Sequence, residues 1–292
     1  PADMPFAGLK VLDMGVIVVG GDTGRLFADL GAEVVKVENG AFPDGQRQSR
    51  DNAPVSLTFA AGHRNKRGLA IDLRSARGKA LFLDLVARAD VLCSNFKPGT
   101  LASLGFDAET LAAANPRLVT VDSSAFGPTG PWSGRLGYGP LVRCSAGLTK
   151  QWVYPGEPES FSDTITVYPD HVAARIGACT AAALLIRRMR TGRGGIASIS
   201  QAEVMLAQKG AEIAALGAEA AGLRLETDEM AEDWLLPCAG DDEYCVATIR
   251  AADRAALAGI VGEERAAAEQ WAARHSPEEV MAQLQAAGVP AG

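Results

Sequence analysis

Short β-rich runs of hydrophobic residues alternate with helical stretches through the first two-thirds of the chain. The predicted strands cover residues 9–14, 33–38, 91–94, 118–122 and 196–200, and helices are predicted at 23–30, 75–88, 108–114, 170–190 and 203–221. Alternation of this kind, with roughly 20 to 30 residues per repeat, is typical of βαβ units. The pattern therefore predicts an α/β fold built on a parallel sheet.

Polar side chains follow several of the predicted strands. Glu38, Asn95 and Ser123 each lie where a strand ends. In open parallel sheets ligands bind beyond the carboxyl ends of the strands, so we expect one crevice to gather all three. The apolar run 16–19 precedes Gly20 and Gly21, and its pattern predicts the buried end of a strand.

Two irregular stretches divide the chain. Residues 127–158 are rich in Gly and Pro and predict a long functional loop. An acidic, aperiodic stretch at 223–232 predicts a boundary between a large domain, 1–222, and a smaller α/β domain, 233–292. The small domain is expected to hold strands at 234–236 and 244–249 and helices at 251–261 and 277–287. Because the chain ends directly after a loop-like Gly-Val-Pro-Ala stretch, we expect this domain to be truncated at its C-terminal end.

Asp170 stands at the junction between Tyr168-Pro169 and a long Ala-rich helical stretch. A carboxylate in this position faces unpaired helix N–H groups, which favour its ionised form. Such a group can attack a thioester carbonyl as a nucleophile. The alternative is an ordinary helix N-cap, a role in which Asp is common. His171 is expected to point away from Asp170, since adjacent helix residues do not share a face.

Composition narrows the class of protein. A net charge of −7 and a pI near 5.1 argue against a nucleic-acid surface. Five scattered cysteines without a CxxC pair, together with only three histidines, predict a reduced, cytoplasmic protein without a metal. The apolar part of the 170–190 helix is interrupted by Arg175 and is too short for a comfortable membrane span.

Several motifs gain meaning from their order along the chain, which runs Leu30–Glu38, Asn65–Leu73, Asn95–Gly99, Leu104–Phe106, Phe126–Pro131, Gly137–Tyr138, Asp170 and Thr191–Gly194. In this order and spacing they resemble the family III CoA-transferases, which include formyl-CoA transferase, carnitine-CoA transferase and α-methylacyl-CoA racemase. The resemblance extends from Leu9 to Gly292 and is most specific over residues 24–195. It implies a Rossmann-like large domain, a smaller second domain and an interlocked homodimer.

The resemblance also implies a reaction and its residues. Asp170 matches the catalytic aspartate, which attacks an acyl-CoA and passes CoA to a carboxylic acid through an aspartyl anhydride and an aspartyl-CoA thioester. No metal is required. The residues expected to bind CoA are Asn95, Phe96, Lys97, Lys66, Arg67 and Arg74, and those expected to shape the loop over the thioester are Gly127, Gly130, Gly137 and Tyr138.

Each of these residues could instead have a purely structural role. Arg74 could equally be a solvated surface charge, since most charged side chains are exposed. The three glycines could be turn punctuation. Trp132, Trp152 and Tyr154 suggest an aromatic-lined pocket suited to a bulky acyl group, with packing in the core as the alternative.

Two of the departures from the family pattern bear on the reaction. Val18 stands where formyl-CoA transferase has a glutamine that helps to hold the reacting carboxyl, which argues against formyl/oxalyl exchange. Tyr138 stands where the racemase branch has a catalytic histidine, which favours transfer over racemisation. The alternatives that remain are an acyl-CoA racemase or epimerase and a catalytically silent CoA-binding module of a larger protein.

Overall fold

The chain folds into two compact units. The computed structural model describes residues 4–49, 53–153, 159–160, 167–223, 231–262 and 264–292. Contacts divide the chain into Pro1–Ile213 and Ala214–Gly292, so the division falls inside helix α9 (Gly210–Ala220). This point precedes residue 222, where the sequence pattern placed the end of the large domain.

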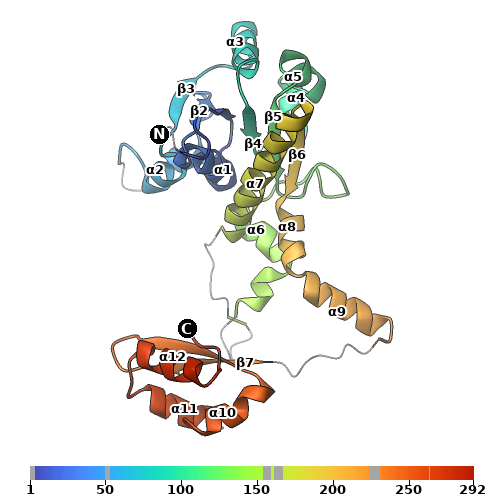
Figure 1. Ribbon diagram of the computed structural model, residues 1–292. Helices are drawn as coiled ribbons and strands as arrows, with labels where there is room; N and C mark the ends of the chain where they lie inside the picture. The colour runs from blue at the N-terminus through green and yellow to red at the C-terminus, as the bar shows by residue number, and fades with distance from the viewer. Residues whose placement is uncertain (1–3, 50–52, 154–158, 161–166, 224–230, 263) are drawn as a thin grey trace. The chain divides into compact units, whose positions relative to one another are not determined.

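The first unit is built on a six-stranded sheet in which every pairing is parallel (Figure 1). The strand order is β3-β2-β1-β4-β5-β6. The strands are β1 Lys10–Asp13, β2 Glu33–Glu38, β3 Arg67–Ala70, β4 Val91–Ser94, β5 Val119–Ser124 and β6 Gly195–Ser200. The predicted α/β fold with a parallel sheet is confirmed.

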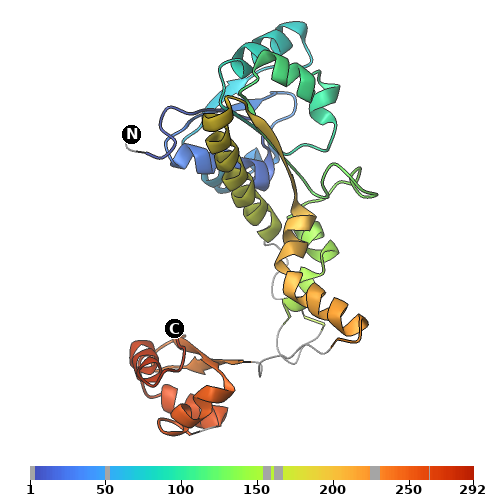
Figure 2. The same ribbon diagram turned by 45° about the vertical axis from the view of Figure 1, so that its right-hand side comes forward.

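Helices cover both faces of this sheet, because successive strand residues point to opposite sides. Val11 and Val91 face α1 (Ile17–Asp29) and α7 (Tyr168–Thr191), whereas Leu12 and Leu92 face α3 (Ala76–Val86) and α5 (Ala108–Ala114). Figure 2 shows α7, in olive, lying along one face of the sheet. The remaining helices of the unit are α2 Leu57–His63, α4 Thr100–Ser103, α6 Gly139–Ser145 and α8 Gln201–Gln208, with 3₁₀ turns at Gly45–Arg47 and Leu148–Gln151.

Small residues let α7 approach the sheet closely. Ala173, Ala174 and Ala181 are fully buried in the core shared with α1, and a Cβ added to Gly177 would lie 3.3 Å from Val121. The helix ends at Gly192, whose left-handed φ of 71° suits glycine at a helix C-terminus. The Ala-rich pattern therefore holds the N-terminal end of α7 in a fixed place above the sheet.

Three predictions about individual segments were wrong. The apolar run 16–19 is not a strand end, because α1 begins at Ile17. The stretch 127–158 contains helix α6 and a 3₁₀ turn and is not one long loop. The single helix predicted over 203–221 is two helices, α8 and α9, separated at Lys209. In the described part of the chain, no helix is both long enough and apolar enough to span a membrane.

The second unit has a core of its own. Strands β7 (Glu232–Pro237) and β8 (Tyr244–Ile249) pair antiparallel, and Trp234 and Ile249 are buried among helix residues. The helices are α10 Arg254–Ala258, α11 Arg265–Ala272 and α12 Pro277–Ala286. Ser276 and Glu279 form a capping box at the start of α12.

Candidate active site

Asp170 lies in the first turn of α7, as the third helical residue, where the sequence pattern had placed it first. Its side chain is buried, and the residue is only 6% exposed. The backbone N–H groups of Val19 and Gly139 lie near its carboxylate and lower its pKa. Val19 lies in the first turn of α1, and Gly139 is the first residue of α6. The N-terminal ends of three helices therefore meet at one carboxylate, where their dipoles favour negative charge.

Two opposing effects set the acidity of this carboxyl group. Burial raises the pKa of Asp170 to about 6, because the ionised form loses hydration. The charge of His171 and the backbone hydrogen bonds of Val19 and Gly139 act in the opposite direction and lower the pKa. The group is thus ionised near neutral pH yet more basic than an exposed aspartate.

The close approach of the Asp170 carboxylate requires glycine at position 139. A Cβ at this position would lie 2.0 Å from Oδ2 of Asp170, so no other residue fits without displacing it. Tyr138, the neighbouring residue, is 67% exposed and precedes α6. Sequence reasoning selected Tyr138 and missed Gly139; the Gly139-Pro140 pair at a helix start was the available signal.

The residues predicted to bind CoA fall into three places. Phe96 and Arg74 line one cavity of about 350 Å³ beyond the carboxyl ends of β1, β2 and β4, together with Glu38, Asn39 and Phe42. The Arg74 guanidinium lies over the Phe42 ring at 4.5 Å. Lys97 follows Phe96 and is exposed. The structure therefore brings Phe96 and Arg74 together, whereas Lys97 is not among the residues that line this cavity.

Asn95 and Lys66 have partners inside the protein. Asn95 accepts a hydrogen bond from Val16 N at 2.8 Å and donates one to Val16 O at 2.9 Å. The ammonium group of Lys66 is buried and contacts Asp13 Oδ2 and Gly21 O, each at 2.7 Å, and His63 Nδ1 at 3.0 Å. Because an ammonium has three donors, Lys66 has none left for a phosphate in this structure.

Arg67 is not brought to this cavity. Its guanidinium is 76% exposed and pairs at 3.0 Å with Glu33, the first residue of β2. Glu33 lies at the amino end of its strand, whereas Asn95 and Phe96 follow the carboxyl end of β4. The two neighbours Lys66 and Arg67 thus serve different parts of the structure.

The loop glycines lie between β5 and α6. Gly127 and Gly130 adopt left-handed φ values of 75° and 83°, which only glycine adopts readily. A Cβ on Gly137 would approach that of Ala125 to 2.8 Å. They shape the backbone that leads to Gly139, which is the glycine in contact with Asp170.

His171 points to α1 instead of to the nucleophile. Its Nδ1 lies 2.6 Å from Oδ2 of Asp22. Among the aromatic residues, Trp152 packs edge-on against Tyr168 at 5.4 Å and Trp132 against Phe126 at 5.4 Å. Tyr154 lies outside the described residues.

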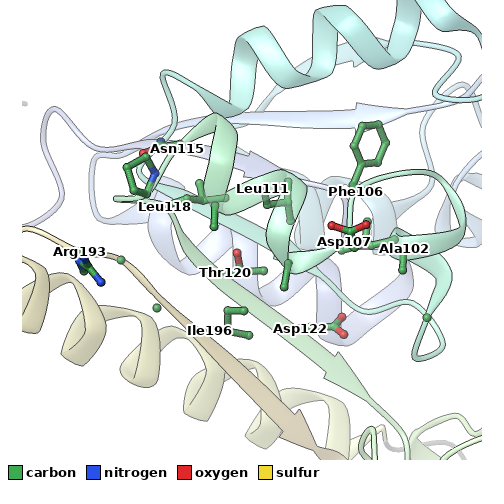
Figure 3. Close-up of a pocket in the computed structure, with 17 residues that line it drawn as sticks. Ala102, Phe106, Asp107, Leu111, Asn115, Leu118, Thr120, Asp122, Arg193 and Ile196 are labelled. Carbon is green, nitrogen blue, oxygen red and sulfur yellow. The ribbon is translucent and has the colours of Figure 1, made fainter.

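A second cavity, of about 510 Å³, lies on the face of the sheet opposite α7, along β5 and β6 beneath α5 (Figure 3). Asp122 stands at one end and Arg193 at the other, with the apolar side chains of Leu111, Leu118 and Ile196 between them. Burial raises the pKa of Asp122 to about 6, and Ser94 Oγ donates to it at 2.8 Å. None of its lining residues contacts Asp170.

Comparison with known proteins identifies the family. A sequence model of CoA-transferase family III matches residues 6–292, and the chain belongs to this family. The protein named Probable CoA-transferase Rv1866 of Mycobacterium tuberculosis is 45% identical over 99% of this chain. The alpha subunit of the succinyl-CoA–L-malate CoA-transferase of Chloroflexus aurantiacus is 32% identical over 67% of it. The chain spans 40% of the first relative and 46% of the second.

Solved structures share the fold over nearly the whole chain. A crystal structure of Rv3272 from M. tuberculosis has a TM-score of 0.80 at 25% identity and covers 99% of this chain and 83% of its own. A CAIB/BAIF family protein from Brucella suis has a TM-score of 0.74 at 27% identity, with the same coverage. Among the described residues, no group of three or more His, Cys, Asp or Glu side chains could hold a metal ion.

The raised pKa of Asp170 predicts a pH-dependent cost of folding. Its folded pKa of about 6 exceeds the ordinary value of 3.8, so the folded protein is destabilised as pH rises through this window. The variant Asp170→Asn is expected to be more stable than wild type above pH 6 by about 3 kcal/mol, with the difference vanishing below about pH 4. Urea unfolding across this pH range measures it.

The control is Asp84→Asn, which replaces an exposed carboxylate. It is expected to change the free energy of unfolding by less than about 0.5 kcal/mol at each pH. A difference between Asp170→Asn and wild type that stays constant from pH 4 to pH 8 would contradict the assignment.

Proposed function

We propose that this chain carries a CoA-transferase centre, in which Asp170 accepts an acyl group from an acyl-CoA and the acyl group's CoA passes to a carboxylic acid. One observation carries the proposal: a buried carboxylate faces the N-terminal ends of three helices. Membership of family III and relatives named as CoA-transferases support it. No comparable observation supports the two alternatives, an acyl-CoA racemase or epimerase and a catalytically silent CoA-binding module.

The acidity of Asp170 suits a nucleophile. A carboxylate with a pKa of about 6 is largely ionised at neutral pH and is more basic than an ordinary aspartate, so it attacks a carbonyl more readily. A carboxylate and a thioester exchange with little change in energy, so transfer needs no external energy source.

The bonds exchange in two symmetrical halves. An Asp170 oxygen attacks the thioester carbonyl, the carbon–sulfur bond breaks, and a mixed anhydride and CoA thiolate result. The thiolate then attacks the Asp170 carbonyl, which releases the donor acid and leaves an aspartyl-CoA thioester. The acceptor carboxylate attacks this thioester to form a second anhydride. The freed thiolate takes the acceptor acyl group and regenerates Asp170.

The helix N–H groups would serve the steps in which Asp170 is itself the electrophile. When the thiolate or the acceptor attacks the Asp170 carbonyl, negative charge develops on the side-chain oxygen. The N–H groups of Val19 and Gly139 lie near this carboxyl group and lower its pKa, so we place them as the donors that would hold that charge. Fixed donors of this kind need no reorganisation as the charge appears.

The cavity lined by Phe96 and Arg74 is the place we propose for CoA. It combines aromatic faces, Phe42 and Phe96, with a guanidinium, which suits an adenine ring beside phosphates. The exposed ammonium of Lys97 stands next to Phe96 in the chain and could pair with a second phosphate group. We assign Asn95 and Lys66 to the support of the site instead of to direct phosphate contact.

The relatives guide the choice of substrates to test. Their names specify succinyl-CoA or acetyl-CoA as donors and L-malate, D-citramalate, oxalate or glutarate as acceptors. Val18, which replaces the glutamine of formyl-CoA transferase, instead favours a less polar acyl group. Following the family resemblance, we also propose an interlocked homodimer in the cytoplasm; the absence of disulfides among the five cysteines supports a reducing compartment.

Covalent trapping tests the nucleophile. The full-length protein is incubated with a panel of acyl-CoAs and hydroxylamine, and peptide mass mapping locates the adduct. We expect a hydroxamate on Asp170 in wild type and none in Asp170→Ala. If CoA binds to wild type but no acyl-CoA of the panel yields this adduct, the transferase proposal fails.

Gly139→Ala tests the fit around the carboxylate. The added methyl group would overlap Oδ2 of Asp170 and displace either the carboxylate or the Gly139 N–H donor. We expect the rate of adduct formation to fall by roughly 10²-fold or more, as for loss of one oxyanion donor. Gly134→Ala is the matched control, because nothing lies within 4 Å of its added Cβ. Equal rates in the two variants would contradict the geometry.

Arg74→Gln tests the CoA cavity. Loss of a charged hydrogen-bond donor to phosphate is expected to raise the Kd for free CoA about tenfold, measured by titration calorimetry. Arg77→Gln, which removes an exposed arginine three residues away on α3, is expected to leave the Kd unchanged. A Kd that is the same in both variants would exclude Arg74 from the site.

A further inference from the structure

The turn between β1 and α1 is held by side chains from distant parts of the chain. Gly15 N donates to Asp13 Oδ1 at 2.8 Å, and Gly15 O accepts from Lys36 Nζ at 2.7 Å. Asn95 holds both backbone groups of Val16. Ile17 N donates to Asp44 at 3.0 Å. Five successive backbone groups are therefore fixed by side chains.

The charged members of this set form one buried network. Lys36 pairs with Asp44 at 3.0 Å, and Lys66 pairs with Asp13 at 2.7 Å; each of these four side chains is at most 3% exposed. His63 connects the pairs: its Nδ1 faces Lys66 at 3.0 Å and its Nε2 faces Asp44 at 3.3 Å. Burial lowers the pKa of His63, which fits a neutral ring whose Nδ1 accepts from Lys66.

The turn is held in a conformation that its sequence disfavours. Ile17 has a φ of 55°, in the left-handed region that β-branched residues avoid. Such backbone persists only where surrounding contacts over-determine it, and it is concentrated at functional sites. The packing of α1 is equally tight, because a Cβ on Gly20 would lie 2.5 Å from Asn95 Oδ1 and one on Gly24 2.3 Å from Asp13 Oδ2.

Stability alone does not account for these contacts. A buried ion pair repays little more than the cost of removing its charges from water, and apolar residues of similar size often serve as well. What the network does fix is the direction of the first turn of α1. Val19, two residues beyond Ile17, presents its N–H to Asp170. The turn also forms a wall of the proposed CoA cavity through Met14 and Val16, and Asp44 lines the same cavity.

We propose that Lys36, Asp44, Asp13, Lys66 and Asn95 are positioning residues, which hold the β1–α1 turn so that the Val19 N–H meets the Asp170 carboxylate. The inference rests on the proposed function for its catalytic consequence. It assigns Asn95 and Lys66 a role different from the phosphate contact that the sequence suggested. The residues act through the turn and do not touch the reacting atoms.

The test is Lys36→Met in the full-length protein. This change removes the bond to Gly15 O and the charge partner of Asp44 while keeping a side chain of similar length. We expect kcat for CoA transfer to fall by roughly 10²-fold with the KM for acyl-CoA changed by less than about threefold. The double variant Lys36→Met/Asp44→Asn removes both charges and covers the case in which the single variant fails to fold.

A second readout separates positioning from general weakening. Loss of the Val19 donor should raise the pKa of Asp170. This pKa is measured by ¹³C NMR titration of labelled aspartate in the substrate-free protein. His171, the residue next to Asp170 in the chain, is unchanged in these variants. Arg188→Met is the control, because it breaks a partly buried ion pair, with Asp90 at 2.8 Å, towards the opposite end of α7. It is expected to lower stability and to leave both kcat and the Asp170 pKa unchanged.

The outcomes distinguish this inference from the proposed function. Unchanged kcat and Asp170 pKa in both Lys36 variants, or an equal effect of Arg188→Met, would overturn the positioning role. A KM increase at constant kcat would also overturn it, in favour of direct contact with CoA. The titration needs no turnover. If the variants raise the Asp170 pKa but the wild-type protein transfers no CoA, the positioning role is upheld and the proposed CoA-transferase function is contradicted.

Discussion

The site depends on keeping one carboxylate ionised out of water. Burial raises the pKa of Asp170 and so opposes its ionisation, whereas full exposure would leave it a weak base. The structure reaches an intermediate state by bringing helix N-terminal ends to the buried group. Val19 and Gly139 belong to the separate helices α1 and α6, both of which precede Asp170 in the sequence. The sheet and its covering helices are the means by which these ends are brought to one point.

The sequence predicts the parts of the fold that are governed by local pattern. The runs of Val and Ile predicted strands close to their true bounds, and three strands, 33–38, 91–94 and 244–249, had the predicted ends. The Ala-rich stretch after Asp170 gave α7. These elements are predictable because their hydrophobic period and their flanking Gly and Pro residues act within a few positions.

The parts that were missed depend on contacts between distant residues. The Val-Ile-Val-Val run has the composition of a strand, yet α1 starts within it, because Asp44 and Asn95 hold the preceding turn from 27 and 79 residues away. For the same reason Lys66 read as a phosphate ligand: a basic residue in sequence does not reveal whether its ammonium faces solvent or a buried carboxylate. Val19 acts through its backbone group, which carries no sequence signature.

The contact between Gly139 and Asp170 has a consequence for how relatives of this protein are read. A homologue can retain the aspartate and the long helix behind it, and so match the family at its most recognisable position, while carrying a larger residue where Gly139 lies. In such a homologue the carboxylate could not occupy the same space. The pair of positions, and not the aspartate alone, is therefore the feature by which an active member could be told from a degenerate one.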